Sequence, residues 1–274
     1  MISFRNDINN LVLSHALTET HEAIARNIRH LASGSRVESP GDDPTNFAIH
    51  EGLNVEQRSL QQAERNANQA VGLLDMADAG LSEVSNLIIR LRELGMAAAN
   101  SDNSDEQHET FSLEAHQLVE EIDRIVKVSS WMGNSMIAGG EDLQFLVGIH
   151  GEPEDFISYP GSQINASSDA LNISDINLED ASDASDALEK LDAAFNQVTQ
   201  MRALVGGTQT RLEIGIDNLH SEQLGVSERS SAISDVDYAR EISQYVSNQI
   251  KQSATVALIG QANLLSSQML SLLT

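Results

Sequence analysis

The sequence predicts a mainly α fold: long antiparallel helices from both chain halves form a coiled-coil bundle, with a small β-hairpin insertion in the middle. Three observations indicate this fold. Apolar side chains recur in steps of three and four over two long stretches, which is the spacing of a coiled-coil seam. The four prolines are confined to residues 40–44 and 153–160, so both stretches lack the strongest helix breaker. Between the stretches, apolar side chains stand at every second position of residues 143–149, which is the period of a strand.

The first helix is expected to end near Ser33, because glycine, here Gly34, is the usual residue just past a helix C-terminus. Its apolar face carries Leu17, Ile24, Ile28 and Leu31. The run Pro-Gly-Asp-Asp-Pro at residues 40–44 then predicts a structured loop.

The longest helix is predicted over residues 60–98, where small and apolar residues fall on a single seam for more than five heptads. The seam consists of Leu60, Ala63, Ala67, Ala70, Leu74, Ala77, Leu81, Val84, Ile88, Leu91, Gly95 and Ala98. Such a helix needs a partner along its length, and residues 188–226 repeat the spacing. The second seam consists of Leu188, Leu191, Phe195, Val198, Val205, Leu212, Ile216, Leu219 and Val226. Arg202, Gln209 and Gln223 interrupt it, and polar seam residues lower stability but can fix the register.

Two further elements lie between these helices. Ser104 and Gln107 form a capping-box pair that starts a helix, and its apolar residues are Phe111, Ala115, Leu118, Ile122 and Ile125. The strand at 143–149 runs into a turn, and residues 156–159 are predicted to return as the second strand of a hairpin. From 128 to 189 the chain has 12 Asp or Glu and no Lys or Arg, so this segment is expected on the outside of the helices.

The composition narrows the classes of partner. The chain carries 16 Lys and Arg against 41 Asp and Glu, a net charge of −25 that repels nucleic acid. It has no cysteine, so disulfides and thiolate chemistry are excluded. The start lacks the pattern of a cleaved secretory signal. Residues 252–274 carry no charge, but they hold too many polar side chains for a lipid-facing helix, so no membrane insertion is expected.

The two uncharged, apolar ends predict a subunit that buries its termini against copies of itself. The residues expected to carry this self-assembly are Ile8, Leu11, Leu17, Ile24, Ile28, Leu31, Val256, Ile259, Leu264, Leu265, Met269, Leu270 and Leu273. A homopolymer is therefore the expected partner.

The sequence predicts no enzyme, no catalytic residue, no cofactor and no metal. His-Glu pairs begin at His21, His50 and His108, but a zinc motif needs a second histidine one helical turn later. Ala25, Asn54 and Ser112 stand at those positions, so the three histidines are expected on solvated helix surfaces. The acidic clusters at 42–43 and 102–105 lack the spacing of a calcium loop and are expected in turns and helix caps.

Seven segments together resemble the bacterial flagellins. They are LASGSRV at 31–37 with GDD at 41–43, RNAN at 65–68, IRLREL at 89–94, EIDRI at 121–125, GGTQTRL at 206–212, SDVDYA at 234–239 and QAN at 261–263. The match covers roughly residues 1–137 and 185–274. The sequence departs from the family at 131–134, Trp-Met-Gly-Asn, where Phe-Asn-Gly is usual.

The resemblance implies a structural subunit of the extracellular flagellar filament, exported through the flagellar type III channel. Residues 1–40 with 236–274 would form the inner-core terminal helices, and 41–137 with 185–235 the helical bundle of the outer tube. Residues 138–184 would form the hairpin and an acidic exposed segment. The family also implies a flagellar export chaperone and a cap protein as partners. Some members are recognised by an animal innate immune receptor through residues that here are Arg90, Leu94 and Glu114.

Three alternatives remain open at this point. A hook-filament junction (hook-associated) protein shares the terminal helices of flagellins. A flagellin carrying an enzymatic insertion would need more than the short segment 138–184. A soluble coiled-coil adaptor would use the same seams without polymerising.

Overall fold

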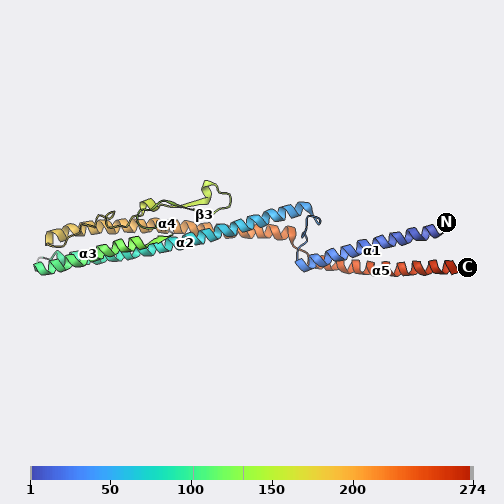
Figure 1. The fold of residues 1–274 in the computed structure, drawn as a ribbon. Coiled ribbons are helices and arrows are strands. Elements are labelled where there is room, and N and C mark those ends of the chain that lie inside the picture. The colour runs from blue at the N-terminus through green and yellow to red at the C-terminus, as the bar shows by residue number, and fades with distance from the viewer. Residues whose placement is uncertain (1, 101, 132, 272–274) are drawn as a thin grey trace. The chain divides into compact units, whose positions relative to one another are not determined.

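The computed structural model describes residues 2–100, 102–131 and 133–271, with backbone alone for 2–7, 9 and 265–271. In these residues the chain forms five α-helices and two antiparallel strand pairs, which confirms the predicted fold class (Figure 1). The elements are α1 (Ile2–Ser33), α2 (Pro44–Ala98), α3 (Asp105–Val128), β1 (Ser130–Trp131), β2 (Asn134–Ser135), β3 (Leu143–Leu146), η1 (Pro153–Asp155), β4 (Phe156–Tyr159), η2 (Gly161–Gln163), α4 (Ala181–Ser234) and α5 (Tyr238–Ser271). Residues 1–57 with 225–274 form one compact unit, and residues 58–224 form another.

In the unit formed by residues 58–224, α2 and α4 pack along the two seams that the sequence predicts. Every residue of the predicted α2 seam is buried, from Leu60 to Ala98. On α4, Leu191, Val198 and Leu212 are completely buried. Small residues let the two helices approach closely. At Gly95, for example, an added Cβ would lie only 3.1 Å from the Leu188 side chain of α4. We call this α2–α4 interface the central seam.

The polar residues that interrupt the central seam each find a polar partner on α2. The contacts are Arg202 to Asp78 at 2.8 and 3.1 Å, Gln209 to Asp75 at 2.7 Å, and Gln223 to Glu64 at 2.8 Å. Residue numbers fall on α2 as they rise on α4, so the helices are antiparallel. A shift of register by one heptad would separate all three pairs, which gives these polar residues a role in alignment.

Helix α3 packs on α2 and begins as predicted. The Gln107 side chain accepts a hydrogen bond from the backbone N–H of Ser104 at 2.9 Å, as a capping box requires. Its buried residues include Ala115 and Ile122, as expected, and also Val119 and Val126.

The predicted hairpin is present as β3 and β4, with Leu143 opposite Tyr159 and Leu146 opposite Phe156. It lies against α4 at Gly215, where an added Cβ would come within 2.9 Å of Val147. Tyr159 is fully buried, and its hydroxyl donates a hydrogen bond to the Met136 carbonyl. Burial raises the pKa of the Tyr159 hydroxyl, so this group stays protonated as a donor.

The segment after the hairpin is less exposed than its acidic composition predicts. Its acidic residues Asp169, Asp175, Glu179 and Asp180 do lie at the surface. Its apolar side chains, however, form a buried row that the sequence analysis did not identify: Ile164, Ala166, Leu171, Ile173, Ile176 and Leu178. The segment is therefore a covering layer with one apolar and one acidic side.

Three helices begin at aspartate caps that set their starts. Asp43 accepts hydrogen bonds from the backbone N–H groups of Thr45 and Asn46, so α2 begins at Pro44. The helix therefore starts 16 residues before the predicted residue 60, and the predicted loop is shorter by one residue. Proline suits the first helical position because its missing N–H would have no partner there. Asp180 and Asp237 cap α4 and α5 in the same way.

Replacement of a central-seam side chain should destabilise the unit strongly. Ile88 is 0% exposed, whereas its neighbour Ile89 is 44% exposed. We expect Ile88→Ala to lower the free energy of unfolding by about 2–5 kcal/mol, because it leaves a cavity. Ile89→Ala is the matched control and should cost less than about 1 kcal/mol. Urea unfolding followed by circular dichroism measures both, and equal losses would contradict the placement of the seam.

Candidate functional site

Helices α1 and α5 pack side by side as an antiparallel pair (Figure 1). Their facing positions follow heptad spacing on both helices, and each facing residue is buried or half-buried. On α1 these positions are Asn10, Leu13, Leu17, Thr20, Ile24, Asn27 and Leu31, and on α5 they are Glu241, Tyr245, Asn248, Gln252, Thr255, Ile259 and Ala262. We call this α1–α5 interface the terminal seam.

The terminal seam is polar for a coiled coil. Among the described side chains, its cross-helix hydrogen bonds include Asn27 to Glu241 at 2.5 Å, Asn248 to Asn27 at 3.0 Å, Gln252 to His21 at 3.3 Å and Asn10 to Asn263 at 3.4 Å. Asn27 and Glu241 are only 6% and 8% exposed. Polar seam residues specify register at a cost in stability. The α1–α5 helix pair is therefore well aligned, but its interface contributes little stability.

The outward faces of the same two helices carry large apolar side chains. On α1 these are Ile8, Leu11, Val12 and Ile28, and on α5 they are Tyr238, Ile242, Val246, Ile250, Val256, Leu258 and Leu264. Their exposed fractions run from 44% at Val246 to 71% at Leu11. Scattered single apolar residues are normal on a protein surface, but rows of them along two adjacent helices indicate an interaction surface.

Charge is distributed unevenly between the two units. Residues 58–224 hold 29 Asp or Glu against nine Lys or Arg, a net charge of −20. The residues of α1 and α5 together hold four acids and five cations. Copies of the terminal helices can therefore approach one another without the electrostatic repulsion that the rest of the chain would impose.

The predicted self-assembly residues fall into two groups. Ile8, Leu11, Ile28, Val256 and Leu264 lie on the exposed faces. Leu17, Ile24, Leu31 and Ile259 are half-buried in the terminal seam. The side chains of Leu265, Met269 and Leu270, and the whole of Leu273, lie outside the described residues.

One part of this surface escaped the sequence analysis. Tyr238, Ile242, Val246 and Ile250 form a stripe at intervals of four residues along α5. The signal was present, since positions four apart share a helix face. Charged Arg240, Glu241 and Lys251 break up the apolar composition of this stretch and obscure the pattern.

The loop after α1 is tied closely to the start of α5. Gly34 adopts φ +73°, and an added Cβ there would lie 3.1 Å from the Tyr238 hydroxyl. The His30 ring lies 3.2 Å from Glu241 through Nδ1 and 4.0 Å from Asp42 through Nε2. Burial raises the pKa of Asp42. Hydrogen bonds from the Ser39 hydroxyl and backbone N–H outweigh this effect and hold the pKa of Asp42 below its ordinary value.

The His-Glu pairs have structural roles. His21 contacts Gln252 at 3.3 Å, and His50 contacts Ser230 at 3.2 Å. The expectation of solvated histidines is wrong for His108, which is 7% exposed and lies 3.0 Å from the Leu178 carbonyl. The covering segment after the hairpin buries it. No group of metal-binding side chains and no helix suited to crossing a membrane occurs in the described part of the chain.

The three residues implied in immune recognition are not equally accessible. Arg90 and Glu114 are exposed and bind each other at 2.7 Å. The hydrogen bonds that Arg90 donates to Glu114 and Glu93 raise its pKa above the ordinary value. Leu94 is 4% exposed and belongs to the core.

The fold and the exposed terminal faces together indicate a helical subunit with an interaction surface on its terminal helices. Comparison with known families places this subunit more closely. Residues 5–142 match the bacterial flagellin N-terminal helical region, and residues 188–273 match the bacterial flagellin C-terminal helical region. The chain belongs to the bacterial flagellins, and it is a structural subunit of the flagellar filament.

Individual relatives agree with this assignment. The flagellar filament 33 kDa core protein of Treponema phagedenis is 31% identical, with 98% of each chain covered. The flagellin of Bacillus subtilis is 28% identical, with 90% of this chain and 91% of that one covered. The crystal structure of Bacillus cereus flagellin gives a TM-score of 0.51 at 28% identity, over 57% of this chain and 88% of that chain.

A putative flagellar hook-associated protein from Vibrio parahaemolyticus also has this fold. Its TM-score is 0.59 at 16% identity, over 71% of this chain and the whole of that one. The shared fold does not favour the hook-associated alternative, because the family match and the named relatives are flagellins.

The loop carboxylate Asp42 should make stability depend on acid pH. Because its folded pKa is depressed, its contribution is present above the ordinary value of 3.8 and is lost as the pH falls through the folded pKa. We expect Asp42→Asn to cost about 1–2 kcal/mol at pH 7 and much less at pH 3. Thermal unfolding at both pH values measures the difference. Glu51→Gln, an exposed carboxylate on α2, should show no such pH-dependent loss.

Proposed function

We propose that the outward faces of α1 and α5 are the surfaces through which copies pack into the filament. The observation that carries this proposal is the pair of apolar rows on two helices that together hold almost no net charge. Burial of each large apolar side chain contributes about 1.5–3 kcal/mol. Several such contacts per subunit would offset the roughly 4–15 kcal/mol that association costs in lost freedom.

Within this proposal the units take different places in the filament. Residues 1–40 with 236–274 form the inner core, since they hold the apolar rows and little charge. Residues 41–137 with 185–235 form the surrounding tube, and residues 138–184 face outward with their acidic side in water. The segregation of charge supports this order, because a highly acidic surface is most stable in contact with solvent.

The remaining parts of the proposal rest on family membership. The filament is extracellular, and the subunit reaches it through the flagellar export channel with the help of an export chaperone and a cap protein. Immune recognition would use Arg90 and Glu114, which are accessible, with Leu94 supporting them from the core. We infer no catalytic role in this function.

A charge placed on the α5 stripe should block assembly without unfolding the subunit. Val246 is 44% exposed and contributes little to the terminal seam. We expect Val246→Asp to keep the circular dichroism spectrum of the monomer and to reduce seeded elongation at least about tenfold, because a buried carboxylate is strongly disfavoured. The control is Ser247→Asp, on the same helix but off the stripe. Normal elongation of the Val246 variant would reject this surface.

Deletion separates filament assembly from the coiled-coil adaptor alternative. A chain lacking residues 252–274 keeps the central seam and loses the uncharged end of the chain. We expect it to form no filaments when seeded, as judged by electron microscopy, and to keep the unfolding transition of the 58–224 unit. Unchanged association of the shortened chain would favour an adaptor.

A further inference from the structure

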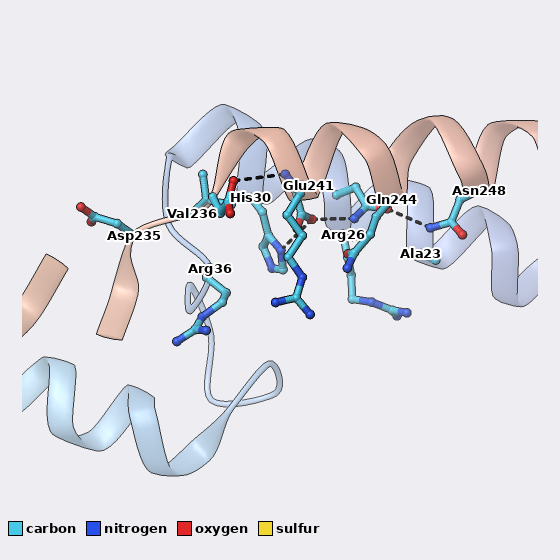
Figure 2. A pocket seen from close by; sticks show the side chains of 12 residues that line it. Ala23, Arg26, His30, Arg36, Asp235, Val236, Glu241, Gln244 and Asn248 are labelled. Atoms are coloured by element: carbon cyan, nitrogen blue, oxygen red, sulfur yellow. Dashed lines mark hydrogen bonds and ion pairs between the residues drawn. The ribbon is translucent and has the colours of Figure 1, made fainter. Parts of the chain in front are cut away.

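A cavity of about 380 Å³ opens beside the junction of α1, the following loop and α5. Figure 2 shows Arg26, Arg36, His30 and Glu241 around it, and Arg240 is also among its lining residues. All its lining residues belong to the unit formed by 1–57 and 225–274. We call this cavity the arginine socket.

The carboxylates that line the socket are already satisfied within the chain. Glu241 accepts hydrogen bonds from Asn27 and from the His30 ring. Asp237 accepts from the backbone N–H groups of α5 at 3.0 and 3.1 Å. Asp235 accepts a hydrogen bond from Ser231. These acids are therefore engaged in structural roles and do not neutralise the arginines through direct contacts.

The cationic groups of the socket are left with unused donors. Arg36 donates one hydrogen bond to the Ile233 carbonyl at 2.8 Å. Arg26 and Arg240 have no hydrogen bond or ion pair from their guanidinium groups within the described residues. His30 Nε2 is buried without a hydrogen-bond partner among them, and its nearest carboxylate is 4.0 Å away.

Arginines of this chain fall into two groups: some bind carboxylates, whereas others, such as Arg29, Arg58 and Arg211, have no side-chain hydrogen bond or ion pair among the described residues. In the other unit Arg90, Arg92, Arg124 and Arg202 each bind at least one carboxylate, at distances of 2.6 to 3.1 Å. With 41 acids against 16 cations, a free guanidinium group is surrounded by acids that could bind it. The socket differs from these exposed sites because two unpaired guanidinium groups line one cavity together with the buried, unpartnered Nε2 of His30.

We propose that the arginine socket receives an acidic side chain from a second copy of this chain in the filament. Guanidinium groups bind carboxylates by paired, charge-assisted hydrogen bonds, and the buried Nε2 of His30 adds a further unpartnered polar atom to the lining. The second copy is the favoured source because its 58–224 unit alone supplies 29 acids. This inference rests on the proposed function, and it adds a polar contact that fixes how neighbouring copies align.

Neutralising the socket should weaken assembly while leaving the monomer folded. We expect Arg26→Gln and Arg240→Gln each to raise the critical concentration for seeded elongation about tenfold, the effect of losing one charge-assisted hydrogen bond. The matched control is Arg29→Gln, which removes the same charge from an exposed position on α1 that does not line the socket. The control should elongate like the unmodified chain.

Salt provides an independent readout. The difference between the unmodified chain and the socket variants should shrink as sodium chloride rises from about 50 mM to about 500 mM, because salt screens exposed charges. Equal elongation by all three arginine variants, whether normal or reduced, would overturn the socket. So would a filament map in which no carboxylate of a neighbouring copy lies within hydrogen-bond distance of Arg26 or Arg240.

Failure of the socket and failure of the proposed function give different results. If the unmodified chain does not elongate, or if Val246→Asp elongates normally, then the apolar assembly surface is wrong whatever the arginine variants do. If elongation is normal for the unmodified chain and lost in Val246→Asp, while Arg26→Gln and Arg240→Gln match Arg29→Gln, only the socket is wrong.

Discussion

Two paired helices can bury only one stripe of each helix against the other, and the rest of both surfaces must meet water or another partner. The 58–224 unit meets this constraint within the chain, because α3, the hairpin and the segment after it cover further faces of α2 and α4. The terminal pair has no such cover in the described residues. Under the proposed assembly, its outward apolar faces would be covered by neighbouring copies.

The central and terminal seams differ in their content of apolar and polar residues. The central seam combines leucine, isoleucine and alanine with polar residues that pair across it, so it is both stable and aligned. In the terminal seam, Asn27 and Glu241 occupy the most buried positions. Amide and carboxylate groups at these places fix the alignment of the helices but add little hydrophobic stabilisation. We infer that the terminal pair is aligned before assembly and gains most of its stability from it.

The spacing of apolar residues predicted correctly those helices and strands that pack one face against a single neighbouring element. Leu60 to Ala98 could be placed on one seam because every step of three or four obeys the same rule, and tertiary packing did not override it. The hairpin followed from alternation, and the end of α1 from Gly34. The uncharged, apolar ends predicted self-association, and the family resemblance specified a filament, since nothing in the helical spacing alone distinguishes a filament subunit from an adaptor.

Two features escaped prediction because their burial depends on a neighbour that is distant in sequence, and a third escaped because charged residues mask its pattern. His108 reads as a surface residue until the segment ending at Leu178 covers it. The apolar row in that segment escaped notice because acids stand between its members and no regular period connects them. On α5 the charged residues that hide the stripe from Tyr238 to Ile250 include Arg240 and Glu241, which line the socket. The composition of this stretch mixes apolar and charged residues, whereas in the helix they lie on different faces.

Separation of charge from apolar surface explains how so acidic a chain can polymerise. At physiological salt, repulsion between exposed charges fades over about 8 Å, so the acidic units need only be kept at the solvent side of a packed core. The nearly neutral terminal helices can then make close apolar contacts, which act only at short range. Where an acidic unit must approach that core, the unpaired Arg26 and Arg240 would turn a repulsive contact into an attractive one. Apolar burial would thus set the strength of assembly, and the few free cations would set its alignment.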